Sequence, residues 1–339
     1  MAVWLHANGG RLGGRNVQLI RRDTGGAAPD LSRRHAQELV LEQGVEILSG
    51  LDFSPNAYAV GTIAALSRVP AIIMNAASSG IPARSPYVVR VSFTVAQVTV
   101  PLAAWALRAG LHDVCSLVAD YAPGAEAEAA FGKSLLAGGG HLVAALRVPL
   151  NTLDFSSWLQ RVRDLKPQAL FFFFPSGVMP MALLRAWKER GMAESGIRLI
   201  ATGDATDDSY LETIGALAAG LVTSHHYSYA HDSHANRRFV RAFEDQHGPH
   251  MRPGYFAVAA HDALAAAELA YARAGEGAQG ERLLRAFEGL KFESPRGPVE
   301  IDPATRDIVQ SVYIRRTELR ERRWVNVEFE RFERQRDPG

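Results

Sequence analysis

The chain has 339 residues, of which 47% are hydrophobic and 22% charged, and its formal net charge is +1. A net charge this close to zero gives no excess of positive charge to attract nucleic acid or an anionic membrane, so neither is expected as a partner. The single cysteine, Cys115, excludes an internal disulfide and a four-sulfur zinc site. The chain contains no run of about 18 apolar residues, so no membrane span is predicted. The length favours two lobes.

The first part of the chain alternates short apolar runs with amphipathic stretches, a pattern typical of parallel βα units. Strands are predicted at residues 16–21, 45–49 and 71–74, and a helix at residues 32–43. Ser54 and Pro55 predict the start of another helix, because serine is favoured as an N-cap and proline at the first helical position.

A second series of βα units begins near Ala96. Lys166 and Pro167 should end one of its helices sharply, since the residue before a proline avoids helical geometry. The predicted helices are 100–108, 125–136, 155–165 and 180–190, and the predicted strands are 114–119, 143–148, 169–174, 198–202 and 220–224. Helices at 235–246, 255–273 and 281–288 follow, then strands near 299–301 and 309–315. The mixed charges of the tail predict a solvated segment, and the whole pattern predicts two α/β lobes with a cleft.

Ligands of open parallel sheets bind outside the carboxyl ends of the strands, so the loops there are the candidate site. Ser54 could hold a carboxylate with its hydroxyl and the free N–H groups of its helix, or it could only cap that helix. Ala76, Ala77 and Ser78 belong to a loop of small residues that lets donors approach a ligand closely; an ordinary turn is the alternative.

Three further loops in the second series carry candidate ligand contacts. Tyr121 could present a ring face and a hydroxyl, or be a tyrosine at the rim of a tight turn. Ser176 follows the strand at 169–174, and Asp204 follows the strand at 198–202. Asp204, Asp207 and Asp208 could bind an ammonium group, although helix capping is favoured for the last two.

Enzyme signatures are weak throughout, so no catalysis and no cofactor are predicted. The glycines near Gly9 lack the dinucleotide-binding spacing and precede a strand, and neither a P-loop nor a nucleophile elbow occurs. His225, His226, His231 and His234 invite a metal hypothesis, but their spacing differs from that of known zinc helices. His225 and His226 should also point to opposite faces of a strand, so no metal site is favoured.

An ordered set of short motifs resembles the type I periplasmic binding proteins of ABC transporters, specifically the branched-chain amino acid (leucine, isoleucine and valine) branch. The resemblance covers essentially the whole chain. Its markers include Gly13-Gly14-Arg15, Pro86-Tyr87-Val88-Val89-Arg90, Asp120-Tyr121, Lys166-Pro167, His261-Asp262-Ala263 and Gly297-Pro298.

The resemblance implies two Rossmann-like lobes with parallel sheets and a hinge cleft. Lobe 1 would comprise residues 1–95 and 228–307, and lobe 2 residues 96–227 and 308–335. It also implies a periplasmic substrate-binding component of an ABC uptake transporter, which binds an amino acid or a related small carboxylate and is recognised by a membrane permease. A cytoplasmic ligand sensor on the same fold and an α/β enzyme remain alternatives.

In the family, the groups at Ser54, Ala76 and Ser78 hold the ligand's carboxylate and an aromatic residue at Tyr121 closes over the ligand. An acid after the strand that ends at Thr202 pairs with the α-ammonium, and Ala205 falls near that place. The resemblance therefore leaves open an aromatic or aliphatic acid without an amino group. Tyr227 and Tyr255 or Phe256 could line such a pocket, or be ordinary core aromatics.

The chain departs from the family at its start. Family members begin with an export signal and a central strand, whereas Met1 falls inside the first helix here. Loss of a central strand would expose two sheet edges. The sequence is therefore expected to be a fragment or to carry a misassigned start.

Overall fold

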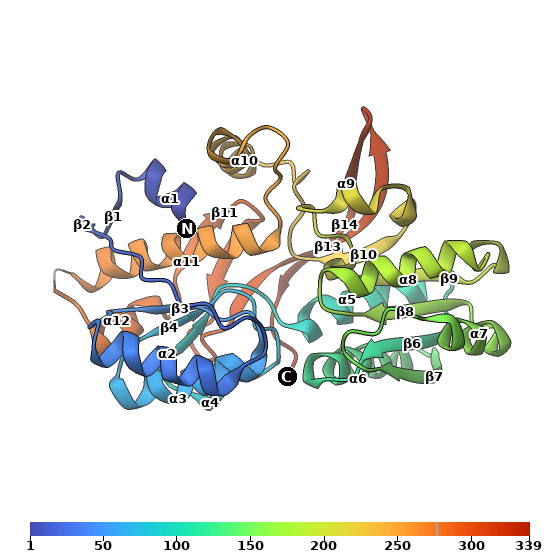
Figure 1. Cartoon of the computed structure of the whole chain (residues 1–339), viewed down its shortest axis with the longest axis horizontal. Coiled ribbons are helices and arrows are strands. Elements are labelled where there is room, and N and C mark those ends of the chain that lie inside the picture. The colour runs from blue at the N-terminus through green and yellow to red at the C-terminus, as the bar shows by residue number, and fades with distance from the viewer. Residues whose placement is uncertain (276) are drawn as a thin grey trace. The chain divides into compact units, whose positions relative to one another are not determined.

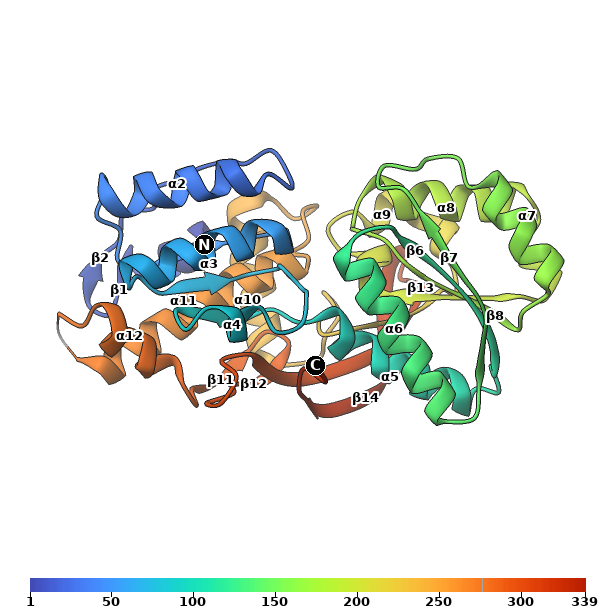
Figure 2. The same cartoon turned by 90° about the horizontal axis from the view of Figure 1, so that it is seen from below.

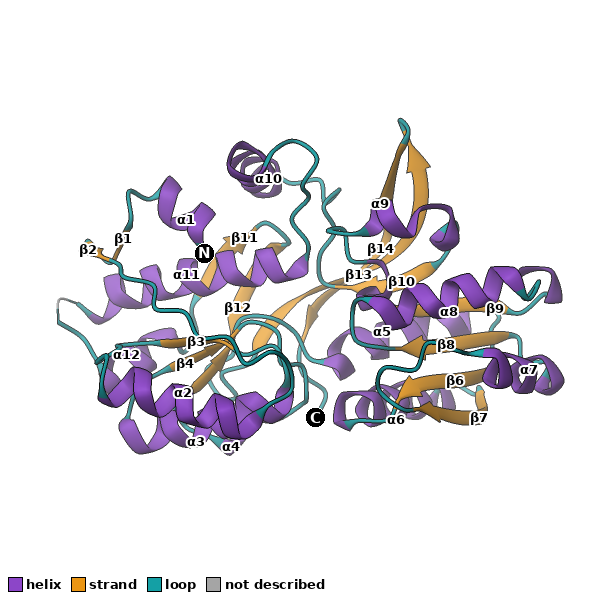
Figure 3. Cartoon of the chain, in the orientation of Figure 1, coloured by secondary structure: helices purple, strands orange, loops and turns teal. Residues whose placement is uncertain are grey.

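A computed structural model describes residues 1–275 and 277–339, which divide into two compact lobes. Lobe 1 comprises residues 1–94, 233–311 and 334–339, and lobe 2 comprises residues 95–232 and 312–333. Each lobe is α/β, as predicted (Figures 1 and 3). Among the described residues, no helix is both long and apolar enough to cross a membrane.

Lobe 1 contains a short parallel sheet in the order β3-β4-β5 and an antiparallel set β11-β12-β13. Its helices and strands are α1 (Ala2–Ala7), β1 (Arg11–Leu12), β2 (Arg15–Asn16), α2 (Pro29–Leu41), β3 (Leu48–Gly50), α3 (Ser54–Ser67), β4 (Ala71–Ile73), α4 (Ile81–Arg84), β5 (Val88–Arg90), α10 (His234–His247), α11 (Tyr255–Ala274), α12 (Gly280–Phe287), β11 (Lys291–Ser294), β12 (Gly297–Ile301) and the start of β13 (Ile308–Arg320).

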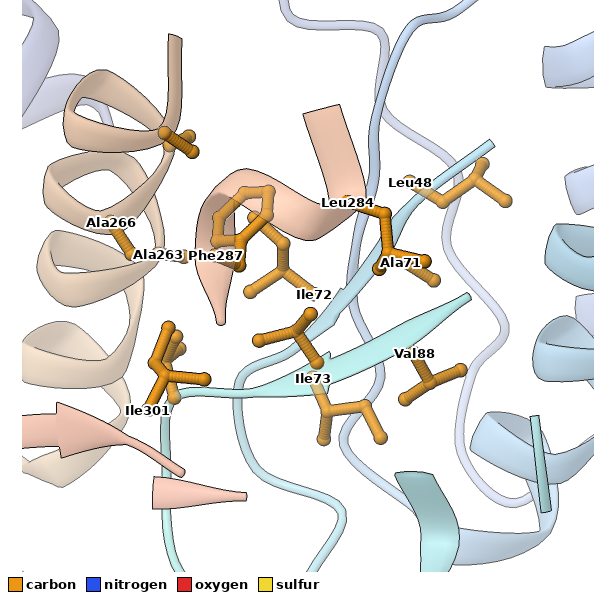
Figure 4. Packing of buried hydrophobic residues seen from close by; sticks show 14 of the residues in the cluster. Leu48, Ala71, Ile72, Ile73, Val88, Ala263, Ala266, Leu284, Phe287 and Ile301 are labelled. Atoms are coloured by element: carbon orange, nitrogen blue, oxygen red, sulfur yellow. The ribbon is translucent and has the colours of Figure 1, made fainter. Parts of the chain in front are cut away.

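The core of lobe 1 lies between its parallel strands and its later helices. The β4 residues Ala71, Ile72 and Ile73 are fully buried, because parallel strands are covered by helices on both faces. In Figure 4 the side chains of Ala263 on α11 and Phe287 on α12 lie in the same cluster as these strand residues. Helices α2 and α3 lie side by side on the other side of the sheet (Figure 2).

Lobe 2 contains a parallel sheet in the order β10-β9-β8-β6-β7, to which β13 adds an antiparallel strand next to β10. Its remaining elements are α5 (Val95–Arg108), β6 (Asp113–Ala119), α6 (Ala122–Ala137), β7 (His141–Val148), α7 (Ser156–Leu165), β8 (Ala169–Phe173), α8 (Val178–Glu189), β9 (Arg198–Thr202), α9 (Leu211–Ile214), β10 (Val222–His225), β14 (Arg323–Gln335) and short 3₁₀ turns at Ala193–Ser195, Gly203–Thr206 and Gly215–Ala218.

The phenylalanines of β8 show how the lobe 2 sheet is packed. Successive side chains of a strand point to opposite faces. Phe171 stacks on Phe131 of α6 with ring centroids 4.2 Å apart, whereas Phe172 packs in the cluster that includes Leu183 and Trp187 of α8. The apolar run predicted as a buried strand is therefore buried on both faces. Helix α7 ends at Leu165 before Lys166 and Pro167, as predicted.

One prediction about the chain's strands is wrong and one strand was missed. Residues 16–21 were predicted as a strand, but only Arg15–Asn16 is one, because residues 17–21 pair with no strand in the part of the chain that the structure describes. The charges of the tail were predicted to be solvated, and Arg316, Arg320, Arg322 and Arg323 are exposed whereas Arg315 is buried. The long strand β14 at Arg323–Gln335, which pairs with β13, was not predicted. Its charged side chains alternate with apolar ones, so one face can be buried while the charges stay in solvent.

Candidate functional site

Two serines meet at the carboxyl ends of β3 and β4 in lobe 1. The backbone N–H of Ser78 donates to Ser54 Oγ at 3.1 Å, and both residues are buried. The prediction that Ser54 is the N-cap of its helix is wrong, because Phe53 occupies that position and the Ser54 hydroxyl contacts the neighbouring loop instead. The two loops proposed to bind a carboxylate are thus joined by a direct hydrogen bond.

The hydroxyl of Ser78 stands out among these groups. It is fully buried, and the described part of the chain offers it no hydrogen-bond partner. Leaving a buried polar group unpaired costs about 1–3 kcal/mol. A ligand oxygen or a water molecule that accepted this O–H would remove that cost.

Arg90, the last residue of β5, fixes the Ser78 loop through hydrogen bonds from its guanidinium. Its guanidinium is fully buried, donates to Ser78 O at 2.8 Å and to Phe93 O at 3.3 Å, and pairs with Asp307 at 2.7 Å. Burial raises the pKa of the Asp307 carboxyl to about 6, even though Arg90 favours its charged form. Arg90 is therefore a positioning residue for the serine loop, a role that sequence analysis did not assign.

The rest of the Ser78 loop is fixed on both sides. The backbone N–H of Ala76 donates to Leu51 O at 2.8 Å, so this amide is engaged within lobe 1, and Ala77 is half-buried. On the far side, Ser79 Oγ donates to the carboxylate of Asp337 at 2.7 Å and Thr94 Oγ1 donates to it at 3.0 Å. The loop that carries Ser78 is therefore held by three separate parts of lobe 1.

Aromatic side chains lie next to this polar group. Phe93, whose carbonyl accepts from Arg90, packs edge-on against Tyr255 at a centroid distance of 5.9 Å. Tyr255 in turn stacks on Phe256, with centroids 4.4 Å apart. Phe256 is 39% exposed, while Phe93 and Tyr255 are buried. Lobe 1 thus combines hydroxyl groups with a short run of rings.

In lobe 2, Tyr121 lies between β6 and α6 and is the N-cap of α6. Its ring lies parallel to that of Phe173, with a 6.2 Å centroid separation and a 6° angle between the planes. Gly124 permits the tight turn, because a side chain there would collide with the carbonyl of Ala119. The Tyr121 ring is therefore fixed in place by its stacking on Phe173 of β8.

The turn after β9 gathers three of the predicted polar residues. Ser176 Oγ donates to Asp204 O at 3.0 Å, and Thr202 Oγ1 donates to the Asp204 carboxylate at 2.8 Å. Ala205 in the same turn is buried and brings no charge to the position where an acid was considered. Asp207 accepts the N–H of Ser209 at 3.0 Å within the turn, whereas Tyr210 is the N-cap of the following helix α9, so the helix-capping role favoured for Asp207 is wrong.

Tyr227 lies in the chain segment that follows β10 and is fully buried. Its carbonyl accepts from the buried guanidinium of Arg315, which also donates to Thr223 Oγ1 at 3.2 Å. Burial raises the pKa of the Tyr227 hydroxyl well above its ordinary value, so it stays protonated. Gly203 is required beside this network, because a side chain there would meet Arg315 and His225.

The predicted orientation of the adjacent histidines is wrong. The rings of His225 and His226 lie 4.3 Å apart, centroid to centroid, and both are fully buried. Strand β10 ends at His225, so the alternation of faces does not continue to His226. Within the residues that the structure describes, no three His, Cys, Asp or Glu side chains come together to hold a metal ion.

The family follows from comparison with known proteins, since the model of a family described as periplasmic binding protein matches residues 1–321. The chain belongs to the periplasmic binding protein family. A Leu/Ile/Val-binding protein homolog of Brucella melitensis is 39% identical over 338 residues, which cover 99% of this chain and 87% of the relative.

Solved structures agree with this assignment. An ABC transporter solute-binding protein of Rhodopseudomonas palustris, in complex with 3,4-dihydroxybenzoic acid, is 41% identical with a TM-score of 0.95, over 99% of this chain and 92% of that one. A second protein of R. palustris, in complex with 4-hydroxybenzoate, is 37% identical with a TM-score of 0.95, over 99% and 91%. This binding protein is thus the solute-binding component of an ABC transporter, as the resemblance implied.

Sequence analysis missed the residues that position the binding protein's loops. Arg90 was noted only as part of a family marker, and Arg315 was counted only among the mixed charges of the tail, which runs from Arg315 to Arg323. Arg90 is a lone arginine inside the apolar run Val88–Val91, and this signal could have found it, since a buried arginine needs several acceptors. Arg315 follows the apolar run Val312–Ile314 and precedes Arg316, so its sequence carries no such signal.

Proposed function

We propose that this binding protein takes an aromatic carboxylate of the benzoate type. The observation that carries the proposal is the turn after β9, where Ala205 is buried and the adjacent Asp204 carboxylate already accepts the Thr202 hydroxyl. A ligand ammonium needs a negative partner when it leaves water. A ligand with a carboxylate and no ammonium needs none.

The donors and rings of the two lobes support the same ligand class. Ser54 and Ser78 offer hydroxyl groups suited to a carboxylate, with the buried Ser78 hydroxyl the leading candidate. Tyr121 offers a flat face, and aromatic rings stack favourably in parallel or edge-on arrangements. Two relatives with 37% and 41% identity were solved with hydroxybenzoic acids.

In this proposal the carboxylate docks on Ser54, Ala77 and Ser78 of lobe 1, and Tyr121 of lobe 2 covers the ring. Ser176, Asp204, Tyr227 and Phe256 line the remainder of the site and meet any ring hydroxyl. The protein binds its ligand in the periplasm and passes it to a permease in the cytoplasmic membrane, with no chemical step. Deletion of the gene should then abolish uptake of radiolabelled ligand while leaving its intracellular metabolism intact.

The test is a thermal-shift and calorimetric comparison of benzoate, 4-hydroxybenzoate and 3,4-dihydroxybenzoate with leucine, isoleucine and valine. A ligand at 100 times its dissociation constant adds about 2.7 kcal/mol to the free energy of unfolding, which gives a visible shift. Benzamide lacks the carboxylate and cyclohexanecarboxylate lacks the aromatic ring, so each isolates one half of the recognition. Stabilisation by the amino acids alone would refute the proposal.

Variants separate the site from the fold. Ser78→Ala and Tyr121→Ala should each weaken binding of the aromatic acid at least tenfold. Ser67→Ala and Tyr58→Ala are matched controls, because Ser67 bonds only within its own helix and Tyr58 contacts Arg84 on the surface of lobe 1. Equal affinities of all four variants would refute these site assignments.

A further inference from the structure

Residues 334–339 return to lobe 1 after strand β14, and we call this segment the strap. The chain leaves lobe 2 for the last time between residues 333 and 334. Arg334 Nη2 donates to Glu300 at 2.9 Å, and Arg336 Nη1 donates to Asp302 at 2.5 Å. The strap is therefore bonded to lobe 1 at two points before its acid, Asp337.

The Asp337 carboxylate accepts three hydrogen bonds from lobe 1. Ser79 Oγ and Thr94 Oγ1 donate to its Oδ1 atom at 2.7 and 3.0 Å. The backbone N–H of Gly80 donates to its Oδ2 atom at 3.3 Å. Ser79 and Gly80 directly follow Ser78 in the chain. Because hydrogen bonds to a charged group are roughly twice as strong as neutral ones, this acid is a firm hold on the Ser78 loop.

The strap also connects to the group that holds Ser78 itself. Asp302, which pairs with Arg336, donates its backbone N–H to Asp307 O at 2.8 Å. The Asp307 carboxylate pairs with Arg90, and Arg90 donates to Ser78 O at 2.8 Å. A closed ring of contacts within lobe 1 therefore runs from Ser78 through the strap and back to Ser78.

The Ser78 hydroxyl depends on its backbone for its position. It is fully buried and has no hydrogen-bond partner in the described residues, so no bond of its own fixes it. Hydrogen bonds from a hydroxyl to a carboxylate are short, about 2.5–2.7 Å, and a recognition group should lie within about 0.5 Å of its productive position. Arg90 fixes the Ser78 carbonyl, and Asp337 fixes the two residues that follow. These two anchors therefore set the place of the hydroxyl.

We propose that Asp337 is a positioning residue of the ligand site, which acts through the Ser78 loop rather than by contact with the ligand. It holds Ser79 and Gly80 so that the Ser78 hydroxyl meets the ligand's carboxylate. The inference rests on the proposed function for the identity of the ligand, whereas the hold on the loop exists without a ligand.

The first test measures the affinity of the full chain for 4-hydroxybenzoate by calorimetry. Asp337→Ala should weaken binding roughly tenfold. Asp337→Asn should weaken it only about threefold, because its amide oxygen can still accept both hydroxyl bonds while the Gly80 bond is lost. The matched control is Glu333→Ala, since Glu333 pairs with the exposed Arg331 at 3.6 Å, and its affinity should equal that of the wild type.

A double-mutant cycle separates positioning from general destabilisation. If Asp337 acts through Ser78, Asp337→Ala should change the affinity less than about twofold in the Ser78→Ala background. Additive effects would place Asp337 in a separate contact with the ligand. A lower urea midpoint with an unchanged affinity would leave it a structural role only, and tighter binding by Asp337→Ala would show that the strap competes with the ligand. Each of these three results would overturn the proposal.

Amide hydrogen exchange of the free protein tests the hold on the loop without a ligand. The Ser78 N–H, which donates to Ser54 Oγ, should exchange roughly tenfold faster in Asp337→Ala, while the amides of β8 in lobe 2 keep the wild-type rate. If this acceleration is seen and the wild type binds no aromatic acid, the proposed function fails and the positioning role stands. Unchanged exchange at Ser78 would overturn the positioning role for any ligand.

Discussion

Asp262 and Arg296 form an ion pair inside lobe 1, and neutralising its acid should destabilise the protein strongly. Arg296 Nη2 lies 2.9 Å from the Asp262 carboxylate, and both side chains are fully buried. Ser294 Oγ donates to the same carboxylate at 2.8 Å, and Arg296 Nη1 donates to Ser92 O at 3.1 Å. Asp262→Asn keeps the shape of the acid but leaves a guanidinium charge without its counter-charge in a site that excludes water.

Removing one partner of a buried ion pair costs about 3–5 kcal/mol, because the remaining charge has neither water nor a counter-ion. A protein of ordinary stability, about 5–15 kcal/mol, should still fold. Urea unfolding should therefore show a lower midpoint with an unchanged slope, since the surface exposed on unfolding is the same.

The matched control is Glu281→Gln, which neutralises the acid of the exposed pair with Arg285 on α12. Both partners of that pair are in solvent, so the change should cost less than about 1 kcal/mol. The double variant Asp262→Leu with Arg296→Met should recover much of the lost stability, because no charge then remains buried. A loss below about 1 kcal/mol for Asp262→Asn would refute the reasoning.

Three other predictions concern stability and reactivity. Burial raises the pKa of Asp208 to about 7, so between about pH 4 and pH 7 the folded protein keeps a proton on this carboxyl that the unfolded chain has released. The stability that is fully present below pH 4 is therefore lost as the pH rises through 7. Relative to Asp208→Asn, the wild type should lose about 4 kcal/mol of unfolding free energy between pH 4 and pH 8 in urea titrations. Phe131→Ala removes a ring stacked on Phe171 and should cost about 3–5 kcal/mol in the same assay, and a cost below 1 kcal/mol would contradict the packing. Burial raises the pKa of the Cys115 thiol to about 12, so iodoacetamide should label it only after denaturation; rapid labelling of the folded protein would show that it is accessible.

Local patterns were enough to predict much of the fold. The apolar run at residues 169–174 and the Lys166-Pro167 helix end depend on neighbours in sequence, and the structure has both. Segment 17–21 shows where local patterns stop. Its residues suit a strand, but a strand exists only when another strand pairs with it, and this depends on what lies beside it in space.

The candidate loops could be placed because they follow strands, but the contacts between them could not be predicted. The Ser54 hydroxyl was interpreted as a helix cap, whereas it accepts a hydrogen bond from the backbone N–H of Ser78, which is 24 residues away. The His225 and His226 side chains were assigned to two faces because the strand was expected to continue. Both errors depend on where a helix or strand begins or ends to within one residue: Phe53 is the N-cap of α3, and β10 ends at His225. Hydrophobic periodicity does not predict such a boundary.

The buried arginines fix the loops of the candidate site by hydrogen bonds to the loop carbonyls. Arg90, Arg296 and Arg315 are the largest side chains that are fully buried, and burial of such a charge is expensive unless many acceptors surround it. Here the acceptors include backbone carbonyls outside regular pairing: Ser78 and Phe93 for Arg90, Val91 and Ser92 for Arg296, and Tyr227 for Arg315.

Carbonyls in loops have no ladder partner, so a guanidinium with five donors can satisfy several of them at once. Each arginine lies on or beside a strand of its lobe and thereby fixes an irregular segment to the rigid sheet. Because Arg90 donates to the Ser78 carbonyl, this network fixes the position of the loop that we propose to bind the ligand's carboxylate. A change of specificity in this protein should therefore be sought in the loop side chains, with the three arginines left in place.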